Sequence, residues 1–222
     1  MSTIVVKVGG AVAATVASQV NDLATRCCKV VVVHGAGPQI SAEMERRGLA
    51  VEFVGGRRVT SPEALAVVKE SFAVVNSTLC DAVGPRAVPL FGDEIGLAAR
   101  HVPELGLVGD PLPCAPPAIE AALELDRIPV VAPLATGPLN VNADEAASAL
   151  AIGLGADKIL FLTDVPGLLL EGSVVPSIAA GTAEDLLDAG ELEGGIVPKL
   201  RAAVTAAKLG VEAEIGETAV MA

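Results

Sequence analysis

Tryptophan and tyrosine are absent from the 222-residue sequence, and aromatic residues make up only 2% of it. Apolar residues still make up 52%, so the core has to be built from Val, Leu, Ile and Ala. Cores of this kind are typical of parallel sheets that are buried on both faces. A chain of this length buries roughly 70% of its unfolded surface, which is enough for a stable core. The composition therefore favours an α/β fold.

Cysteine and histidine are also scarce. The four cysteines form no Cys-x-x-Cys pair, and only His34 and His101 are available to join them as metal ligands. Disulfide frameworks and zinc sites depend on such clusters. We therefore expect neither, and we predict no protein-held metal.

Positive charge is in short supply, because the chain has a formal net charge of -12 with 15 Lys and Arg residues. A surface that binds nucleic acid or an anionic membrane needs a basic footprint. We therefore expect a small-molecule partner, with no nucleic acid and no membrane. If that partner is an anion, a few of the basic residues must converge on its site.

Long apolar runs are missing as well, since no stretch approaches the roughly 18–20 residues that cross a bilayer. Residues 1–20 are apolar enough to suggest a secretion signal. However, Lys7, Gly9 and Gly10 interrupt the run, and its removal would delete the first predicted strand. We expect a cytoplasmic protein that keeps this segment.

Short apolar runs alternate with helical patterns along the chain. The runs predict strands at residues 4–8, 29–33, 87–90, 129–131, 158–162 and 211–215. Helices are predicted up to about Arg26 and at residues 39–47, 61–83, 117–125, 142–154, 182–189 and 198–209. A hairpin is predicted around Gly55-Gly56. This alternation predicts a three-layer α/β/α sandwich with a mainly parallel central sheet, whose ligands bind at the carboxyl ends of the strands.

The predicted helix at 61–83 carries one apolar stripe with steps of three and four residues. Its members are Leu65, Val68, Phe72, Val75, Leu79 and Val83. A stripe of this width is typical of a helix that packs on a core or on a second copy of itself.

Two glycine-rich segments follow the first two predicted strands. In Lys7-Val8-Gly9-Gly10 a lysine precedes glycines whose backbone N–H groups can approach phosphate oxygens closely. The segment from His34 to Pro38 leads a buried strand into a helix N-terminus, which suits an anion. It also matches the start of a dinucleotide fingerprint, but Ile40 stands where the third glycine belongs, which disfavours that interpretation.

Two polar segments add candidate ligands. Arg57 and Arg58 are neighbours in a predicted strand, so their side chains point to opposite faces and one of them can reach a pocket as a carboxylate fork. In the segment 140–147, Asn142 fits the N-cap of a helix and Asp144 its positive end. Capping explains Asn140 less well, so a polar pocket stays open as an alternative.

Two further segments lie near the carboxyl end. Residues 163–169 follow a buried strand, and residues 194–199 lead into a helix. Glycines and Pro198 are ordinary punctuation at such positions. Taken alone, Lys199 is no more than a possible surface charge.

Taken in order, these segments resemble the amino-acid kinase family, and Asn140-Val141-Asn142-Ala143-Asp144 is the most specific part. The resemblance implies ATP-dependent phosphorylation of the side-chain carboxylate of N-acetylglutamate in arginine biosynthesis. It implies an acceptor-binding lobe at residues 1–139, an ATP-binding lobe at 140–222, one continuous sheet, and Mg2+ that enters with ATP. It also implies a homodimer through the helix at 61–83 and no inhibition by arginine.

The same resemblance assigns roles to individual residues. It implies that Lys7 and Lys199 neutralise the transferring phosphoryl group and that Asp144 orients both. It implies contacts with the acceptor and the γ-phosphate at Gly9, Gly10, Ala36, Gly37, Arg58, Asn140 and Asn142. It implies contacts with the nucleotide at Asp164, Val165, Gly167, Leu168, Leu169 and Leu192.

This assignment is chemically consistent, because a carboxylate acceptor has an ordinary pKa of about 4.3 and needs no general base. Lysines, Mg2+ and backbone N–H groups are then sufficient to bring two anions together. The chain departs from the family pattern at Ala36, which replaces a glycine, and at residues 91–95. Two alternatives stay open: an aminoadipate or glutamate acceptor on a carrier protein, and a non-catalytic homologue that only binds ATP or an amino acid.

Overall fold

An eight-stranded sheet forms the centre of the protein, for which a computed structural model describes residues 2–9, 13–26, 28–162 and 166–222. From one edge to the other, its strands are β14 (Ser177–Ala179), β16 (Thr218–Met221), β15 (Glu212–Ile215), β11 (Lys158–Leu162), β1 (Thr3–Val8), β2 (Lys29–His34), β8 (Ile128–Ala132) and β5 (Ala87–Phe91). All neighbours from β15 to β5 pair in parallel. The predicted mainly parallel sheet is confirmed.

Valine-rich runs make β1 and β2 the buried middle of this sheet. Every residue of Ile4–Val8 and of Val30–Val33 is buried. Their register sets Lys7 opposite Val33 and Val8 opposite His34. The two glycine-rich segments therefore leave the sheet side by side at the carboxyl ends of the strands.

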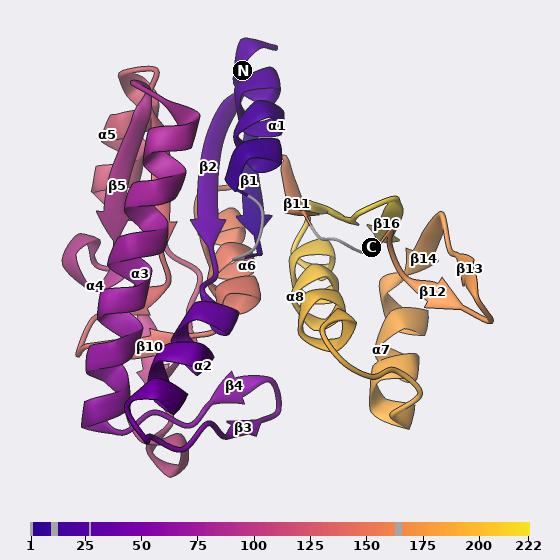
Figure 1. The fold of residues 1–222 in the computed structure, drawn as a ribbon. Coiled ribbons are helices and arrows are strands. Elements are labelled where there is room, and N and C mark those ends of the chain that lie inside the picture. Colours follow the sequence, from indigo (N-terminus) through magenta and orange to yellow (C-terminus); the bar gives the residue numbers. More distant parts are fainter. Residues whose placement is uncertain (1, 10–12, 27, 163–165) are drawn as a thin grey trace.

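Helices cover both faces of the sheet, as the predicted three layers require. Figure 1 shows α1 (Ala13–Thr25) and α3 (Pro62–Val83) in front of the sheet, with α5 (Pro117–Glu124) and α6 (Ala143–Gly153) behind it. Val20 and Leu79 pack with Val6 and Val32 on one face, whereas Leu150 packs with the larger cluster on the other face. The remaining helices are α2 (Gly37–Arg46), α4 (Gly92–Ile95), α7 (Ala180–Ala189) and α8 (Ile196–Lys208), with a 3-10 turn at Pro103–Leu105.

A second, four-stranded sheet lies in the middle of the chain and was not predicted. Its order is β6 (Ala99–His101), β7 (Val108–Pro111), β10 (Leu139–Val141) and β9 (Leu134–Ala135). These strands have two to four residues each, and β7 contains Gly109 and Pro111. Such short runs carry no readable periodicity. The sheet nevertheless shapes the candidate site, because β10 delivers Asn140 to it.

Other differences concern strand lengths and the carboxyl end. The predicted hairpin exists but has two-residue strands, β3 (Phe53–Val54) and β4 (Arg57–Arg58), and both Gly55 and Gly56 have positive φ values. β15 is not the closing strand, because β16 follows and runs antiparallel to it. A hairpin of β12 (Leu169–Leu170) and β13 (Ser173–Val174) was also missed.

The stripe on α3 belongs to the core. Leu65, Val68, Phe72, Leu79 and Val83 are buried within the chain itself. Across the described parts of the chain, no helix combines the length and apolarity that a membrane crossing needs.

Gly153 ends α6 where the helix meets the backbone of Cys114. A Cβ atom at Gly153 would lie 2.2 Å from the Cys114 N and O atoms. We expect Gly153→Ala to lower the free energy of unfolding by about 3 kcal/mol, as overpacking against rigid backbone does. Urea unfolding followed by far-UV circular dichroism measures this loss.

Gly181 provides the matched control, since it lies in α7 with nothing within 4 Å of a Cβ atom. Gly181→Ala should leave stability unchanged or raise it by about 0.5 kcal/mol, because alanine favours a helix. Equal losses in both variants would contradict the packing described at Cys114.

Candidate active site

A cavity of about 720 Å³ opens at the carboxyl ends of β1 and β2. Its walls come from the turn after β2, the β3–β4 hairpin, α3, β10 and the first turns of α6 and α8. The predicted site residues that line it are Lys7, Gly9, Ala36, Gly37, Arg58, Asn140, Asn142, Asp144 and Lys199. Residues from the whole length of the chain therefore meet in one place.

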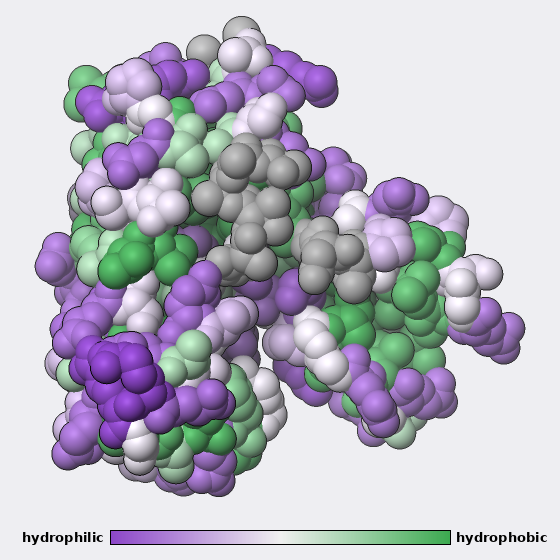
Figure 2. Space-filling view, viewed as in Figure 1, coloured by the Kyte–Doolittle hydropathy of each residue, from purple (hydrophilic) through white to green (hydrophobic). Residues whose placement is uncertain are grey.

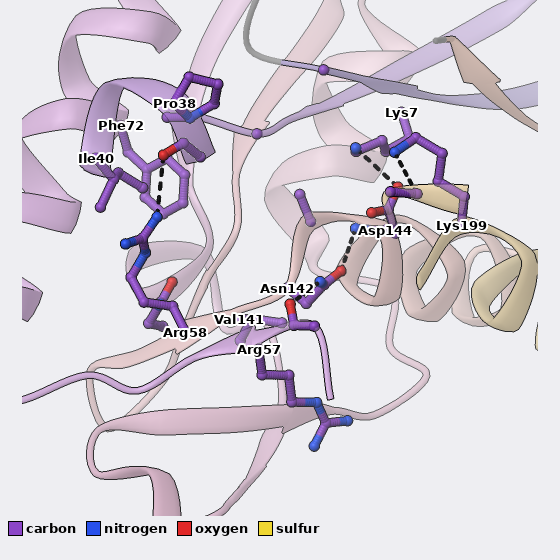
Figure 3. A pocket seen from close by; sticks show the side chains of 18 of the residues that line it. Lys7, Pro38, Ile40, Arg57, Arg58, Phe72, Val141, Asn142, Asp144 and Lys199 are labelled. Atoms are coloured by element: carbon purple, nitrogen blue, oxygen red, sulfur yellow. Dashed lines mark hydrogen bonds and ion pairs between the residues drawn. The ribbon is translucent and has the colours of Figure 1, made fainter. Parts of the chain in front are cut away.

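A buried ion pair lies at the inner end of this cavity. Lys7 Nζ of β1 is 2.9 Å from Asp144 Oδ1 in the first turn of α6, and both side chains are almost completely buried. Each charge compensates the desolvation of the other, and the helix N-terminus adds favourable partial charge beside the carboxylate. Figure 3 shows Lys199, from α8, on the same side of the cavity as this pair. Its Nζ donates to Gly195 O at 3.1 Å.

Asn142 caps α6, as its position in the sequence predicts. Its Oδ1 accepts from the N–H groups of Asp144 and Glu145 at 2.8 and 3.2 Å. Its Nδ2 donates to Gly56 O in the hairpin at 3.1 Å. The same residue therefore fixes the start of α6 and ties the hairpin to it.

Arg58 is buried in the opposite wall. Its Nη2 donates to Gly37 O at 3.1 Å and to Ser41 Oγ at 2.8 Å, and its guanidinium lies 4.5 Å from the centre of the Phe53 ring. Burial lowers the pKa of Arg58 from its ordinary value. These contacts hold a guanidinium fork at the cavity wall without a carboxylate among the contacts described.

A hydrogen-bonded chain connects Arg58 to β10. Asn140 Nδ2 donates to Thr60 Oγ1 at 3.0 Å, and Thr60 Oγ1 donates to Arg58 O at 2.8 Å. All three residues are buried. Asn140 is therefore part of the polar wall that its sequence position indicated.

Arg57 also borders the cavity, but its guanidinium is held by carboxylates. Its Nε lies 2.9 Å from Glu145 Oε2 and its Nη2 lies 2.7 Å from Asp110 Oδ1. Burial acts to lower the pKa of Arg57, but Glu145 and Asp110 outweigh it and the pKa is raised. Figure 3 shows Arg58 turned toward Pro38 and Arg57 turned the other way, so the predicted opposite faces are confirmed.

Sequence reasoning missed the apolar wall of the cavity. Ile40, Phe72 and Val108 line it. Phe72 belongs to the stripe on α3, and its spacing gave no sign that it also borders a ligand space.

His34 is fully buried behind this wall. Asn76 Nδ2 donates to Val130 O at 2.8 Å and lies 3.1 Å from His34 Nε2, so Nε2 acts as the acceptor and the proton belongs on Nδ1. The ring meets Phe72 edge-on, with centroids 5.7 Å apart. Burial lowers the pKa of His34 from 6.5 to about 4, so the ring is neutral at pH 7.

The predicted nucleotide residues do not line this cavity where the structure describes them. Gly167 and Leu168 are buried, the Leu168 N–H donates to Thr218 Oγ1, Leu169 is exposed, and Leu192 packs against the main core. Asp164 and Val165, together with Gly10 from the phosphate segment, lie outside the described residues.

Comparison with known protein families shows to which family the chain belongs. The sequence model of the Amino acid kinase family matches residues 2–216. The chain belongs to this family. Acetylglutamate kinase from Rubrobacter xylanophilus is 40% identical over 224 residues, which cover 97% of this chain and 88% of that protein. The resemblance drawn from the motifs is confirmed.

Solved structures share the fold. The structure of smu.665 from Streptococcus mutans UA159 has a TM-score of 0.90 at 29% identity and covers 99% of this chain and 98% of that one. Carbamate kinase from Giardia lamblia bound to citric acid has a TM-score of 0.74 at 15% identity, with coverage of 99% and 98%. The second likeness concerns the fold alone. The predicted fold class of the family is confirmed.

The neutral state of His34 makes stability depend on pH. His34 takes up a proton near pH 4 in the folded chain and near pH 6.5 in the unfolded chain. Its contribution to the free energy of unfolding is therefore complete above pH 6.5 and is lost as the pH falls toward 4. Between pH 7 and pH 5 we expect His34 to cost about 2 kcal/mol of unfolding free energy. His34→Gln should lack this part of the pH dependence in urea unfolding. Identical slopes for both proteins would contradict a buried neutral imidazole.

The Lys7–Asp144 pair makes stability depend on both partners. Lys7→Met should lower the free energy of unfolding by about 3–5 kcal/mol, because it leaves a buried carboxylate unpaired. The double variant Lys7→Met/Asp144→Asn should recover much of this loss. The exposed pair Lys208–Glu184 serves as control, and Lys208→Met should stay within about 1 kcal/mol of the parent. A loss in Lys7→Met no larger than in this control would contradict the burial of the pair.

Proposed function

We propose that this chain transfers the γ-phosphoryl group of ATP to the side-chain carboxylate of N-acetyl-L-glutamate, forming N-acetylglutamyl 5-phosphate in arginine biosynthesis. The observation that carries the proposal is the meeting of Lys7, Asp144, Lys199 and Arg58 around one cavity. The 40% identity to an acetylglutamate kinase over nearly the whole chain supports the choice of acceptor.

The chemistry requires two anions to come together in line. The acceptor carboxylate is ionised at neutral pH, so the site needs to supply charge compensation and alignment rather than a base. We propose that Lys7 and Lys199 compensate charge on the transferring group and that Asp144 holds the ammonium of Lys7 in place. Backbone N–H groups at Gly9, Gly10, Ala36 and Gly37 would donate to the phosphoryl and acceptor oxygens.

The opposite wall suits the acceptor. We propose that Arg58 binds its α-carboxylate, with Asn140 and Asn142 in the polar wall beside it. Ile40 and Phe72 would contact the apolar part of the acyl group. The side-chain amide of Asn142 is used in capping and in the bond to Gly56, so its contribution would come mainly through the position of α6 and the hairpin.

The nucleotide would bind on the lobe formed by residues 140–222, with residues 1–139 holding the acceptor. We propose that Asp164, Val165, Gly167, Leu168, Leu169 and Leu192 contribute to the ATP site. Figure 2 shows apolar side chains gathered over α8, β14 and α7 on this lobe, a surface suited to an adenine ring. Lys199 at the start of α8 would reach from that lobe toward the phosphates.

Mg2+ would accompany ATP. Among the described residues, no three His, Cys, Asp or Glu side chains are grouped to hold a metal by themselves. Mg2+ is commonly held by substrate phosphates with few protein ligands, so this wall of lysines and amides is compatible with a metal that the nucleotide brings. Mg2+ would draw charge from the phosphoryl oxygens when bound.

We also propose that the enzyme works in the cytoplasm as a homodimer that associates through α3. Val74 on this helix is 67% exposed. The neighbouring strand β5 ends the eight-stranded sheet and leaves an edge next to α3.

Acyl phosphate can be trapped with hydroxylamine to test the proposal. Purified protein with Mg-ATP should form hydroxamate with N-acetylglutamate, and not with glutamate, aspartate or N-acetylaspartate. Lys199→Met should reduce the rate at least about 100-fold, because it removes charge compensation in the transition state. Lys199 is the better test than Lys7, since its side chain is less buried and its replacement leaves the Lys7–Asp144 pair intact.

The outcomes separate the candidates. Full activity in Lys199→Met would remove the role proposed for this lysine. Binding of ATP without hydroxamate from any acceptor would refute N-acetylglutamate as the acceptor and favour a carrier-protein acceptor or a non-catalytic homologue.

A further inference from the structure

Arg57 belongs to a four-residue charge network beside the cavity. Glu145 accepts from Arg57 Nε through both carboxylate oxygens, at 2.9 and 3.1 Å, and Asp110 accepts from Arg57 Nη2 at 2.7 Å. Arg100 Nη2 lies 2.5 Å from the other oxygen of Asp110. We call these four residues the Arg57 network. It contains two positive and two negative charges, so it adds no net attraction for an anionic ligand.

The network connects elements that are far apart in the sequence. Arg57 lies in the β3–β4 hairpin, Glu145 in the first turn of α6, Asp110 in β7 and Arg100 in β6. The Arg57 and Glu145 side chains are 22% and 19% exposed, and that of Asp110 is 26% exposed. Partly desolvated, multidentate Arg–carboxylate contacts are strong and fix geometry.

Outside the Arg57 network, the hairpin is attached through its turn and through the Arg58 side chain, which donates to Gly37 O and Ser41 Oγ. β3 pairs with β4 alone in the described structure, and Phe53 and Val54 are 53% and 49% exposed. The bond from Asn142 Nδ2 to Gly56 O is a further tie at the turn. Arg58, next to Arg57 on the same two-residue strand, carries the guanidinium that faces the cavity wall. The backbone position of Arg58 therefore depends on the contacts of Arg57 as well as on those of the Arg58 side chain.

We propose that Arg57 is a positioning residue, which acts with Glu145 and Asp110 to hold the β3–β4 hairpin over the cavity and so sets the place of Arg58. Arg57 itself does not bind the acceptor, because Glu145 and Asp110 hold its guanidinium through Nε and Nη2, turned away from Arg58. This inference rests on the proposed function only for its kinetic test. The contacts of Arg57 with Glu145 and Asp110, which we call the brace, are a property of the structure itself.

A variant that weakens the contact between Glu145 and Arg57 distinguishes a positioning role of Arg57 from direct binding of the acceptor. Glu145→Gln keeps the shape of the side chain but removes its charge and frees part of the guanidinium. A positioning role predicts that this variant raises KM for N-acetylglutamate about tenfold, equivalent to about 1.4 kcal/mol. The KM for ATP and kcat should stay within about threefold, because the phosphoryl-transfer residues are untouched. A direct ligand, once released from Glu145, would instead keep or lower that KM.

Variants of Arg57 complete the kinetic test. Arg57→Met should raise the KM at least as much, because it also removes the contact with Asp110. Arg57→Met/Glu145→Gln should add little to Arg57→Met, because the contact with Glu145 is already lost. Arg57→Lys should fall between the parent and Arg57→Met, since an ammonium can pair with one carboxylate but cannot form the fork. Fully additive effects in the double variant would overturn the shared brace.

Trypsin gives a readout that does not depend on the substrate, because Arg57-Arg58 provides two cleavage sites in the hairpin. We expect Glu145→Gln to be cut there at least about fivefold faster than the parent under native conditions, since local opening exposes the bonds. The control is Glu184→Gln, which breaks the exposed pair with Lys208 on the surface and should leave the hairpin rate unchanged.

The kinetic and trypsin measurements together distinguish a failure of the proposed function from a failure of the brace. If no acceptor gives hydroxamate, the proposed function fails, while faster cleavage of the Glu145→Gln hairpin still supports the brace. If the cleavage rate and the KM of Glu145→Gln both match the parent, the brace is overturned while the proposed function stands. Faster cleavage with an unchanged KM for N-acetylglutamate would remove the link from the hairpin to the acceptor.

Discussion

The buried ion pair between Lys7 and Asp144 joins the central strand of the large sheet to the first turn of α6, and the rest of the site is arranged around it. An unpaired charge of either sign would be costly in this position. The pair therefore requires β1 and α6 to meet at a fixed distance. Asn142 caps α6 at that place and also holds the hairpin through Gly56 O, so the wall that contains Arg58 is positioned relative to the same ion pair.

The protein has a net charge of -12, and the few cations along its cavity have different kinds of partner. Of the cations along the cavity, Lys7 is matched by Asp144 and Arg57 by Glu145 and Asp110. Arg58 is instead surrounded by a carbonyl, a hydroxyl and an aromatic ring. Such neighbours stabilise a guanidinium without neutralising it, which leaves its attraction for a carboxylate available. The geometry thus separates cations that build the site from those suited to bind within it.

Six of the eight strands of the large sheet, and the helices that cover it, were predictable because their signals are local, whereas β14 and β16 were missed. The valine runs of β1 and β2, the apolar stripe on α3 and the cap at Asn142 each fix one element without knowledge of the others. The second sheet was not predictable, since its short strands gain their stability from neighbours in space. Asn140 shows the consequence: its sequence position indicated a polar pocket, but its partner Thr60, 80 residues away, emerges only from the fold.

The same reasoning explains why the sequence predicts that the two arginines of the hairpin face opposite ways, but not which of the two faces the site. Strand alternation predicts that Arg57 and Arg58 face opposite ways, and this holds even in a two-residue strand. It does not say which side is the pocket, because that depends on β7 and α6, which supply Asp110 and Glu145. Carboxylates on one side and neutral groups on the other give the two identical side chains different environments. Strand alternation thus allows either arginine to face the site, and the packing of Asp110 and Glu145 against Arg57 decides which one does.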